Sequence, residues 1–304
     1  MTLRKAALAL TALTALAACS PKTEPAAAPP APAAAAQTSY SFKIGALQAN
    51  ALLDGAIKVA NDGKTFGIGR PPADVAAVLK GAGRDSLDLS IQPLLVRGEG
   101  RVMLFDAGAA GVGFAQGGQL IASMRAAGVE PAQVTDVFIS HSHADHVGGL
   151  ADAAGNLAFP NAAIHISVPE WRAMQADPSQ AALVKAIAPK VAAFAPGAEI
   201  LPGLVTAVEV RGHTPGHSAY EIASDDQRLL YVGDAVHHFV ISVAKPEWGI
   251  DYDGGSATAP VSRRALLKLA ADQDLRLYAV HFPYPGLGRV KARGEGFVWV
   301  PEAG

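Results

Sequence analysis

Cysteine is nearly absent from this chain of 304 residues, because Cys19 is the only one. A single cysteine excludes a framework of disulfide bonds within the chain. The fold must therefore depend on its hydrophobic core, and half of the residues are hydrophobic while 17% are charged. This composition is typical of a globular protein with a large core, and the length allows one large domain or two modest ones.

An excess of positive charge is also missing. The chain has 25 Lys and Arg residues against 27 Asp and Glu residues, which gives a formal net charge of -2. Proteins that bind nucleic acids usually show a basic patch or stripe that attracts the phosphate backbone. The sequence has neither, so we expect no nucleic-acid partner.

The N-terminus lacks an apolar run long enough to cross a bilayer. Two basic residues precede the apolar run Ala6–Ala18, which is shorter than the roughly 20 residues of a membrane-spanning helix. This layout is typical of a secretory signal peptide, and its end, LAAC (16–19), resembles a bacterial lipobox. We predict a lipoprotein signal peptide over residues 1–18, membrane attachment through lipidated Cys19, and a periplasmic or cell-surface location. The alternative is an ordinary signal peptide with an incidental cysteine near its end.

Large apolar side chains are nearly absent from residues 20–39, which are rich in proline and alanine. Such a segment cannot bury enough surface to offset the entropy lost on ordering. We therefore predict an extended tether over residues 19–39 and a folded domain over residues 40–304.

Short strand-like runs alternate with helical patterns beyond the tether. This interleaving predicts an α/β (α+β) fold in which helices cover the sheets, although propensity leaves the strand order open. Gly98-Glu99-Gly100 separates two strand-like runs and predicts a hairpin. We expect strands over Gln92–Arg97, Arg101–Phe105, Val134–Ser140, Ala163–Ser167, Val205–Val210, Arg228–Val232 and Leu277–Val280, and helices over Gln119–Ala127, Ala181–Ala193 and Val261–Ala271.

The segment HSHADH (141–146) concentrates chemistry directly after a strand-like run. It contains four side chains that can bind a metal, namely His141, His143, Asp145 and His146. A metal site needs imidazole nitrogens and carboxylate oxygens that converge from a rigid support, which a strand end provides. The alternative is a polar loop with clustered histidines, but polar groups packed so densely would go unsatisfied without a cation.

Three further candidates follow other strand-like runs, namely His213, Asp234 and His281. Taken singly, each could be a capping aspartate or a hydrogen-bonded structural histidine. Taken together with the 141–146 segment, they favour a shared metal site at the carboxyl ends of the strands.

The pattern His-x-His-x-Asp-His, followed by a lone His, a Gly-Asp and a final His, resembles the metallo-β-lactamase fold superfamily over about residues 40–304. The resemblance implies a four-layer αββα sandwich with two divalent metal ions at one edge of the sheets. Zinc is the default ion, and Mn, Co or Fe suit the same ligands. In this family His141, His143 and His213 would bind the first ion, Asp145, His146 and His281 the second, and Asp234 would bridge both.

The resemblance points to one branch of that superfamily. Metallo-β-lactamases proper have Cys or Ser where this chain has Asp234, which weakens an antibiotic-degrading function. The segments GHTPGHSAY (212–220), YVGDAVHHFVI (231–241), AVHFPYPGLG (279–288) and FVWVP (297–301) resemble the methyl parathion hydrolase and quorum-quenching lactonase branch. Ser142 and Ala144 depart from it, because that branch often has a bulky apolar residue and Pro inside the motif. Branch relatives are often dimers, which makes a homodimer the implied assembly.

This resemblance predicts a dinuclear hydrolase that attacks a lactone, ester or phosphotriester with a hydroxide shared by the two metals. Asp234 and Asp145 would be the catalytic carboxylates, with Asp145 also able to move a proton. Two alternatives stay open. The first is another hydrolase of the same fold, such as a glyoxalase-type thioesterase or a β-lactamase. The second is a non-catalytic periplasmic metal-binding lipoprotein.

The remaining histidines and some aromatic residues have weaker assignments. His165 lies on a strand-like run and is expected to be structural, and His217 could orient the loop that bears His213. His237 and His238 could line the rim of the pocket or simply pack. Phe66, Phe114 and Trp171 are candidate pocket aromatics, with core packing as the default for each.

Overall fold

Two seven-stranded sheets form the centre of the protein in a computed structural model that describes residues 2 and 38–302. Apart from residue 2, the predicted signal peptide lies outside the described residues, as do Cys19 and the predicted tether as far as residue 37. The first strand begins at Ser39. Within the described part of the chain, no helix has both the length and the apolar character needed to cross a membrane.

The first sheet is antiparallel at one end and parallel at the other. A hairpin joins its third and fourth strands, with Gly98 opposite Arg101, as the Gly-Glu-Gly turn predicted. The last three pairings of this sheet are parallel. In spatial order its strands are β1 (Ser39–Ile44), β2 (Leu47–Leu52), β5 (Leu94–Gly98), β6 (Arg101–Phe105), β7 (Asp136–Phe138), β8 (Ala163–Ser167) and β9 (Val191–Phe194).

The second sheet is antiparallel except for one central parallel pair, β13 and β14. A separate two-stranded sheet pairs β3 (Gly55–Ile57) with β4 (Leu89–Ile91). In spatial order the strands of the second sheet are β10 (Glu199–Leu201), β11 (Val205–Glu209), β12 (Ser218–Ser224), β13 (Gln227–Tyr231), β14 (Arg276–Tyr278), β15 (Leu287–Arg293) and β16 (Gly296–Pro301).

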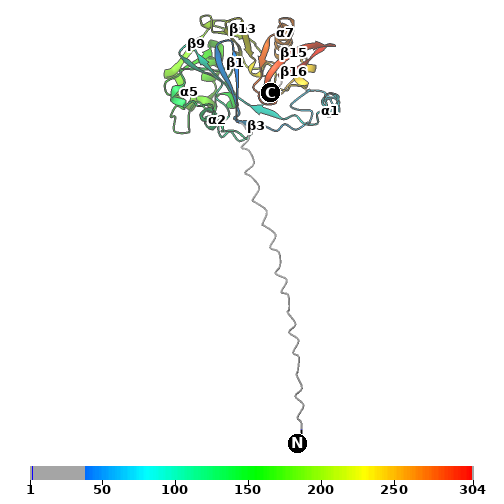
Figure 1. Ribbon diagram of the computed structural model, residues 1–304. Helices are drawn as coiled ribbons and strands as arrows, with labels where there is room; N and C mark the ends of the chain where they lie inside the picture. Colours follow the sequence, from blue (N-terminus) through cyan, green and yellow to red (C-terminus); the bar gives the residue numbers. More distant parts are fainter. Residues whose placement is uncertain (1, 3–37, 303–304) are drawn as a thin grey trace. The chain divides into compact units, whose positions relative to one another are not determined.

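Three hydrophobic clusters divide the molecule into four layers. Phe105 and Phe138 of the first sheet pack against Tyr220 and Tyr231 of the second, so a shared core lies between the sheets. Helices cover both outer faces: α2, α4 and α5 lie against the first sheet, and α7 lies against the second (Figure 1). This arrangement confirms the predicted αββα fold. The helices are α1 (Pro72–Gly81), α2 (Leu120–Ala126), α3 (Ala144–Val147), α4 (Val168–Ala176), α5 (Ala181–Ile187), α6 (Ile241–Ala244) and α7 (Ala259–Asp272).

The predicted helix over Ala181–Ala193 is too long. α5 ends at Ile187, a short 3-10 turn follows, and Val191 already belongs to β9. Pro189 lies in that turn and has no backbone N–H to donate, so it cannot continue the helix. β9 instead adds a parallel strand beside β8.

Parallel pairing in each sheet places the candidate metal-binding residues at one edge. The last residues of β6 and β7 are partners in the first sheet, and the last residues of β13 and β14 are partners in the second. Loops that leave these strands therefore start side by side. Asp106 and His141 follow β6 and β7, while Asp234 and His281 follow β13 and β14.

Candidate metal centre

Three imidazoles converge from two loops and form the first donor group: His141, His143 and His213. The Nε2 atom of His213 lies 2.9 Å from Nδ1 of His143 and 3.1 Å from Nε2 of His141. Oδ2 of Asp234 lies 3.4 Å from Nε2 of His213 and 3.8 Å from Nε2 of His141. Four potential ligand atoms thus lie within 4.8 Å of one another.

A second donor group lies on the other side of Asp234 and consists of Asp145, His146 and His281. Oδ2 of Asp145 lies 3.4 Å from Nε2 of His281 and 3.5 Å from Nε2 of His146. The Oδ1 atom of Asp234 lies 3.1 Å from Nε2 of His281 and 3.2 Å from Nε2 of His146. The two oxygens of one carboxylate therefore face different donor groups.

The structure thus brings together all seven side chains that the sequence singled out. Although they lie 3.2 Å apart, Nε2 of His146 and Oδ1 of Asp234 are not aligned for a hydrogen bond, and both are buried without a hydrogen-bond partner among the described residues. Buried polar atoms normally have a partner, so two orphaned atoms in one place call for an additional group. Imidazole nitrogens and carboxylate oxygens at this spacing suit zinc and similar divalent ions. The donor set therefore fits the metals that the resemblance implies.

Burial and mutual charge set the protonation of these groups. Burial lowers the pKa of His141 well below its ordinary value, which leaves the imidazole neutral with a lone pair to give. Burial also lowers the pKa of His213, to about 4. Burial raises the pKa of Asp234, but the neighbouring charges of His281 and His146 outweigh it and hold that pKa well below the usual range. The carboxylate is therefore ionised, as a metal ligand must be.

A second layer of oxygens orients three of the histidines. In each, the Nδ1–H that points away from the centre donates to an oxygen, which fixes the tautomer and leaves Nε2 facing inward. These contacts join Nδ1 of His146 to Oδ2 of Asp106 at 2.7 Å, Nδ1 of His213 to Oδ1 of Asp253 at 3.1 Å, and Nδ1 of His281 to the carbonyl of Ser90 at 2.7 Å.

Glu170 connects two of the ligand-bearing loops, although sequence reasoning missed it. It is 1% exposed and lies in the first turn of α4. Its Oε1 accepts hydrogen bonds from the backbone N–H and the hydroxyl of Ser142, at 2.8 and 2.7 Å. Its Oε2 accepts from the hydroxyl of Thr214 at 2.7 Å and the N–H of Gly216 at 2.9 Å. Ser142, one of the two departures from the branch pattern, thus has a defined structural partner.

The other histidines divide into pocket and support residues. His237 lines the pocket beside Asp234, with Nε2 at 3.2 Å from Oδ2. His238 does not line it; Nδ1 of that residue accepts hydrogen bonds from the N–H groups of Val240 and Ile241. His217 accepts a hydrogen bond from the backbone N–H of Asp234 at 2.9 Å, so it supports the loop of Asp234.

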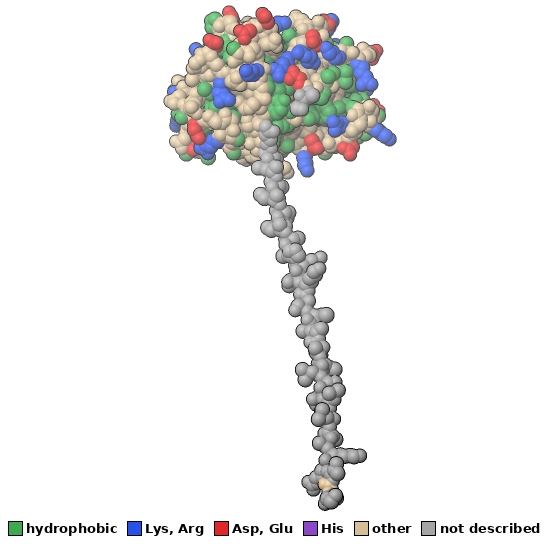
Figure 2. All heavy atoms as spheres, viewed as in Figure 1, with side chains coloured by type: hydrophobic (Ala, Val, Ile, Leu, Met, Phe, Trp, Pro, Cys, Tyr) green, Lys and Arg blue, Asp and Glu red, His purple; other side chains and the backbone are tan. Residues whose placement is uncertain are grey.

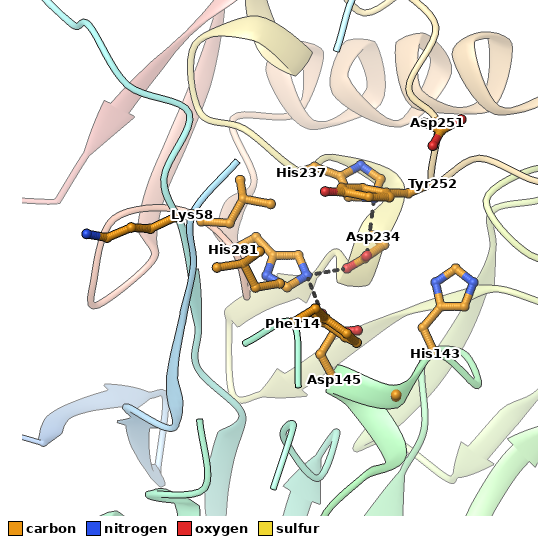
Figure 3. A pocket seen from close by; sticks show the side chains of 12 residues that line it. Lys58, Phe114, His143, Asp145, Asp234, His237, Asp251, Tyr252 and His281 are labelled. Carbon is orange, nitrogen blue, oxygen red and sulfur yellow. Dashed lines mark ion pairs between the residues drawn. The ribbon is translucent and has the colours of Figure 1, made fainter. Parts of the chain in front are cut away.

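A cavity of about 510 Å³ opens over both donor groups, with His143 of the first, Asp145 and His281 of the second and the shared Asp234 in its lining (Figure 3). Ile57, Leu89 and Phe114 supply apolar wall, and Tyr252 lies beside His237. Of the three candidate aromatics, Phe114 lines this cavity and is 57% exposed, whereas Phe66 is buried in a hydrophobic cluster and Trp171 packs against the first sheet's outer core. His141, His146, His213 and His281 are buried, and no histidine is visible on the face drawn in Figure 2.

Comparisons with known proteins find both a family profile and solved structures that this chain resembles. The Metallo-beta-lactamase superfamily profile matches residues 88–281. AidC, a dizinc quorum-quenching lactonase solved with the product N-hexanoyl-L-homoserine, is 31% identical, and the match covers 88% of this chain and 99% of AidC with a TM-score of 0.82. AbOPH, a hydrolase in the beta-lactamase superfamily, is 28% identical over 88% of this chain and 98% of its own, with a TM-score of 0.80.

A curated relative matches a shorter stretch. A probable metallo-hydrolase of Mycobacterium bovis is 28% identical over 129 residues, which are 36% of this chain and 40% of that protein. The match thus spans about two fifths of the length of that relative.

Proposed function

Because the chain belongs to the metallo-beta-lactamase superfamily and is a metallo-hydrolase of that fold, we propose that it opens a lactone ring by hydrolysis, using two divalent metal ions. The proposal of two metal ions rests on the position of Asp234, because its two carboxylate oxygens face separate donor groups. The similarity to AidC over nearly the whole folded chain supports a lactone as substrate. Aryl esters and phosphotriesters are the alternative substrates, because the same two-metal chemistry would hydrolyse them.

The first donor group would bind one ion, the second donor group would bind the other, and Asp234 would bridge them. Zinc suits this mixture of imidazole and carboxylate best. The two ions together supply Lewis-acid polarisation of a carbonyl or phosphoryl oxygen and a water molecule of lowered pKa. Elemental analysis of protein purified without added metal should find two zinc ions per chain. Fewer than two ions of any metal would contradict the dinuclear site.

Residues of the chain provide the proton transfer and the substrate contacts. Burial raises the pKa of Asp145, but the charge of His146 and its hydrogen bond outweigh burial and lower that pKa to about 2. The carboxylate of Asp145 is therefore ionised, as a metal ligand must be, and a carboxyl group of such low pKa would readily pass a proton on to the leaving oxygen. Nδ1 of His237 lacks a hydrogen-bond partner among residues 38–302, Nε2 contacts Asp234, and the ring lines the cavity, so His237 is available to bind a substrate oxygen.

The cavity favours a small molecule with an apolar part. About 510 Å³ lies within the usual range of ligand pockets. Ile57, Leu89 and Phe114 would contact an acyl chain, while the ring to be opened would lie against Asp145 and Asp234, which line the same cavity. Burial of such a chain on these side chains would contribute about 0.8 kcal/mol for each methylene group.

A panel of substrates tests the proposal. It comprises N-hexanoyl-homoserine lactone, an aryl acetate, a paraoxon-like triester, S-lactoylglutathione and nitrocefin, each assayed with zinc-loaded protein. We expect the lactone to have the highest kcat/KM. A higher kcat/KM for S-lactoylglutathione or nitrocefin would reject the lactone in favour of a thioesterase or β-lactamase. Turnover of none, with two metals bound, would reject hydrolysis in favour of metal binding alone.

We also propose that the protein is attached to a membrane through a lipid on Cys19 and acts outside the cytoplasm. The LAAC segment and the Pro/Ala-rich stretch after it support this placement. Mass spectrometry of the membrane fraction should find an N-terminal peptide that begins with an acylated Cys19. A free thiol at this position would contradict the anchor.

A further inference from the structure

Arg263 is the largest fully buried side chain among the described residues, with 1% of its surface exposed. It lies in α7, which packs on the outer face of the second sheet. A buried guanidinium costs several kcal/mol of desolvation unless its donors are paired. The partners that it has therefore indicate its role.

One end of the guanidinium reaches the first donor group through a carboxylate. Nη2 of Arg263 donates to Oδ2 of Asp253 at 2.5 Å. The other oxygen of Asp253, Oδ1, contacts Nδ1 of His213 at 3.1 Å. Arg263 therefore fixes the carboxylate that orients a ligand of the first donor group.

The other donors of Arg263 reach the bridging residue and the wall of the cavity. Nε donates to the carbonyl of Ala235 at 3.0 Å, directly after Asp234 in the chain. Nη1 donates to the carbonyls of Pro246 at 3.1 Å and Trp248 at 3.3 Å. These two residues begin the segment that continues to Tyr252 in the cavity wall.

We infer that Arg263 is a positioning residue that sets metal affinity, because one guanidinium orients His213 through Asp253 and holds the backbone beside Asp234. This inference rests on the proposed metal-dependent function. Without the guanidinium, Asp253 would be a buried carboxylate with one partner fewer, free to rotate away from His213. His213, His237 and Asp253 also lie close enough together to bind a metal. The ion pair with Arg263 disfavours that use, because Asp253 already has a cationic partner.

The neighbouring arginine provides a matched control. Arg264 is half exposed and donates to the carbonyl of Glu295 and to Oε2 of Glu247, at 2.7 and 2.9 Å. It lies on the same helix turn and carries the same charge, but it contacts neither donor group. Arg264→Met therefore removes an arginine from α7 without touching the proposed role.

Zinc affinity measured by competition with a chromophoric chelator tests the inference on full-length protein. We expect Arg263→Met to weaken zinc binding by about 10- to 100-fold, the usual effect of removing a group that orients a ligand. Arg263→Lys should weaken it less, because an ammonium can keep one contact but not all four. Arg264→Met should stay within about twofold of the natural protein.

A purely structural role for Arg263 would give a different result. It would lower the melting temperature of Arg263→Met while leaving the zinc affinity and the visible spectrum of the cobalt-loaded protein unchanged, and that result would overturn the inference. If Arg263→Met does not fold, Asp253→Asn replaces it, because it keeps the shape of the side chain and removes the charge. Asp253→Asn should also weaken zinc binding by at least tenfold; an unchanged affinity would overturn the inference. Failure of the natural protein to bind zinc would instead contradict the proposed function.

Discussion

Two aspartate–histidine clusters lie at opposite ends of β7, and they differ in whether their polar atoms have partners. At the amino end, Oδ1 of Asp136 contacts Nε2 of His165 at 2.9 Å. Oδ2 of Asp136 accepts from Arg101 at 2.8 Å and from the hydroxyl of Thr135 at 2.7 Å. Every side-chain nitrogen and oxygen of Asp136 and His165 that is fully buried has a partner within the described part of the chain.

At the carboxyl end of β7, the same residue types include a buried polar atom without a hydrogen-bond partner. Asp106 contacts Nδ1 of His146 at 2.7 Å and accepts from the hydroxyls of Ser140 and Tyr231 at 2.6 and 2.7 Å. Nε2 of His146, however, stays orphaned and faces Asp234. A satisfied cluster indicates a structural role, whereas an orphaned atom aimed at other donors indicates a place for a ligand. Residue type alone does not separate the two.

The largest expected contrast comes from removing one aspartate from each end. Asp234→Ala should lower kcat/KM by about a thousandfold or more and reduce the bound metal below two ions per chain, because it removes the bridging carboxylate. Asp136→Asn, the matched variant, should keep kcat/KM within about threefold. Steady-state kinetics and elemental analysis on both proteins provide the comparison. Equal losses of activity in the two variants would break it.

Much of the candidate site could be predicted because its residues are recognisable from their local sequence. Each of the seven side chains follows a strand-like run, and parallel strands end at a common edge. Asp106 has the same local mark, since it comes directly after β6, and the same reasoning could have found it. His165 also lay on a predicted strand, and its structural interpretation agrees with its contact to Asp136.

The supporting residues could not be predicted, because their partners are set only by the tertiary fold. Asp253 lies in a loop and contacts His213, 40 positions away. Glu170 and Arg263 lie in helices, where a charged residue normally faces solvent. The helix over Ala181–Ala193 was overextended for a related reason: a helical pattern continued through Pro189, and pairing with β8 decided the structure of Val191.

His237 offers a second contrast, this time within the carboxyl-end region. His237→Ala should lower kcat/KM by about 10- to 100-fold with two metals still bound, because it removes a substrate contact and no ligand. His238→Ala is the control: it should cost about 1 kcal/mol of stability through loss of the cap on Val240 and leave kcat/KM within about threefold. Metal loss in His237→Ala would instead make His237 a ligand.

The pH dependence of stability sharpens the description of the amino-end cluster. Burial raises the pKa of Asp136, but hydrogen bonds from His165, Thr135 and Arg101 outweigh it and lower the pKa to about 2. A pKa lowered by folding gives stability that is complete above the unfolded value near 3.8 and is lost as the pH falls through about 2.

Asp136→Asn should therefore lower the free energy of unfolding by about 2 kcal/mol at pH 7, with the difference shrinking between about pH 4 and pH 2. Urea unfolding across this pH range measures it. Asp272→Asn is the control, since its ion pair with Lys268 is exposed and should contribute less than about 0.5 kcal/mol. A difference between Asp136→Asn and the natural protein that does not change with pH would contradict the role of this carboxylate.

The smallest effect compares one hydroxyl at each end of β7. The hydroxyl of Ser140 donates to Oδ2 of Asp106 at 2.6 Å, and that of Thr135 donates to Oδ2 of Asp136 at 2.7 Å. Ser140→Ala should lower the free energy of unfolding of the metal-free protein by about 1 kcal/mol, the usual net value of one hydrogen bond. Thr135→Val should lower it by more, because the hydroxyl also accepts from the backbone N–H of Val102 at 3.1 Å. Only Ser140→Ala should also weaken zinc binding, by a few-fold, because Asp106 orients His146. If both variants bind zinc as the natural protein does, the contact between Ser140 and Asp106 does not affect zinc affinity. The proposed orienting role of Asp106 at the carboxyl end of β7 would then be contradicted.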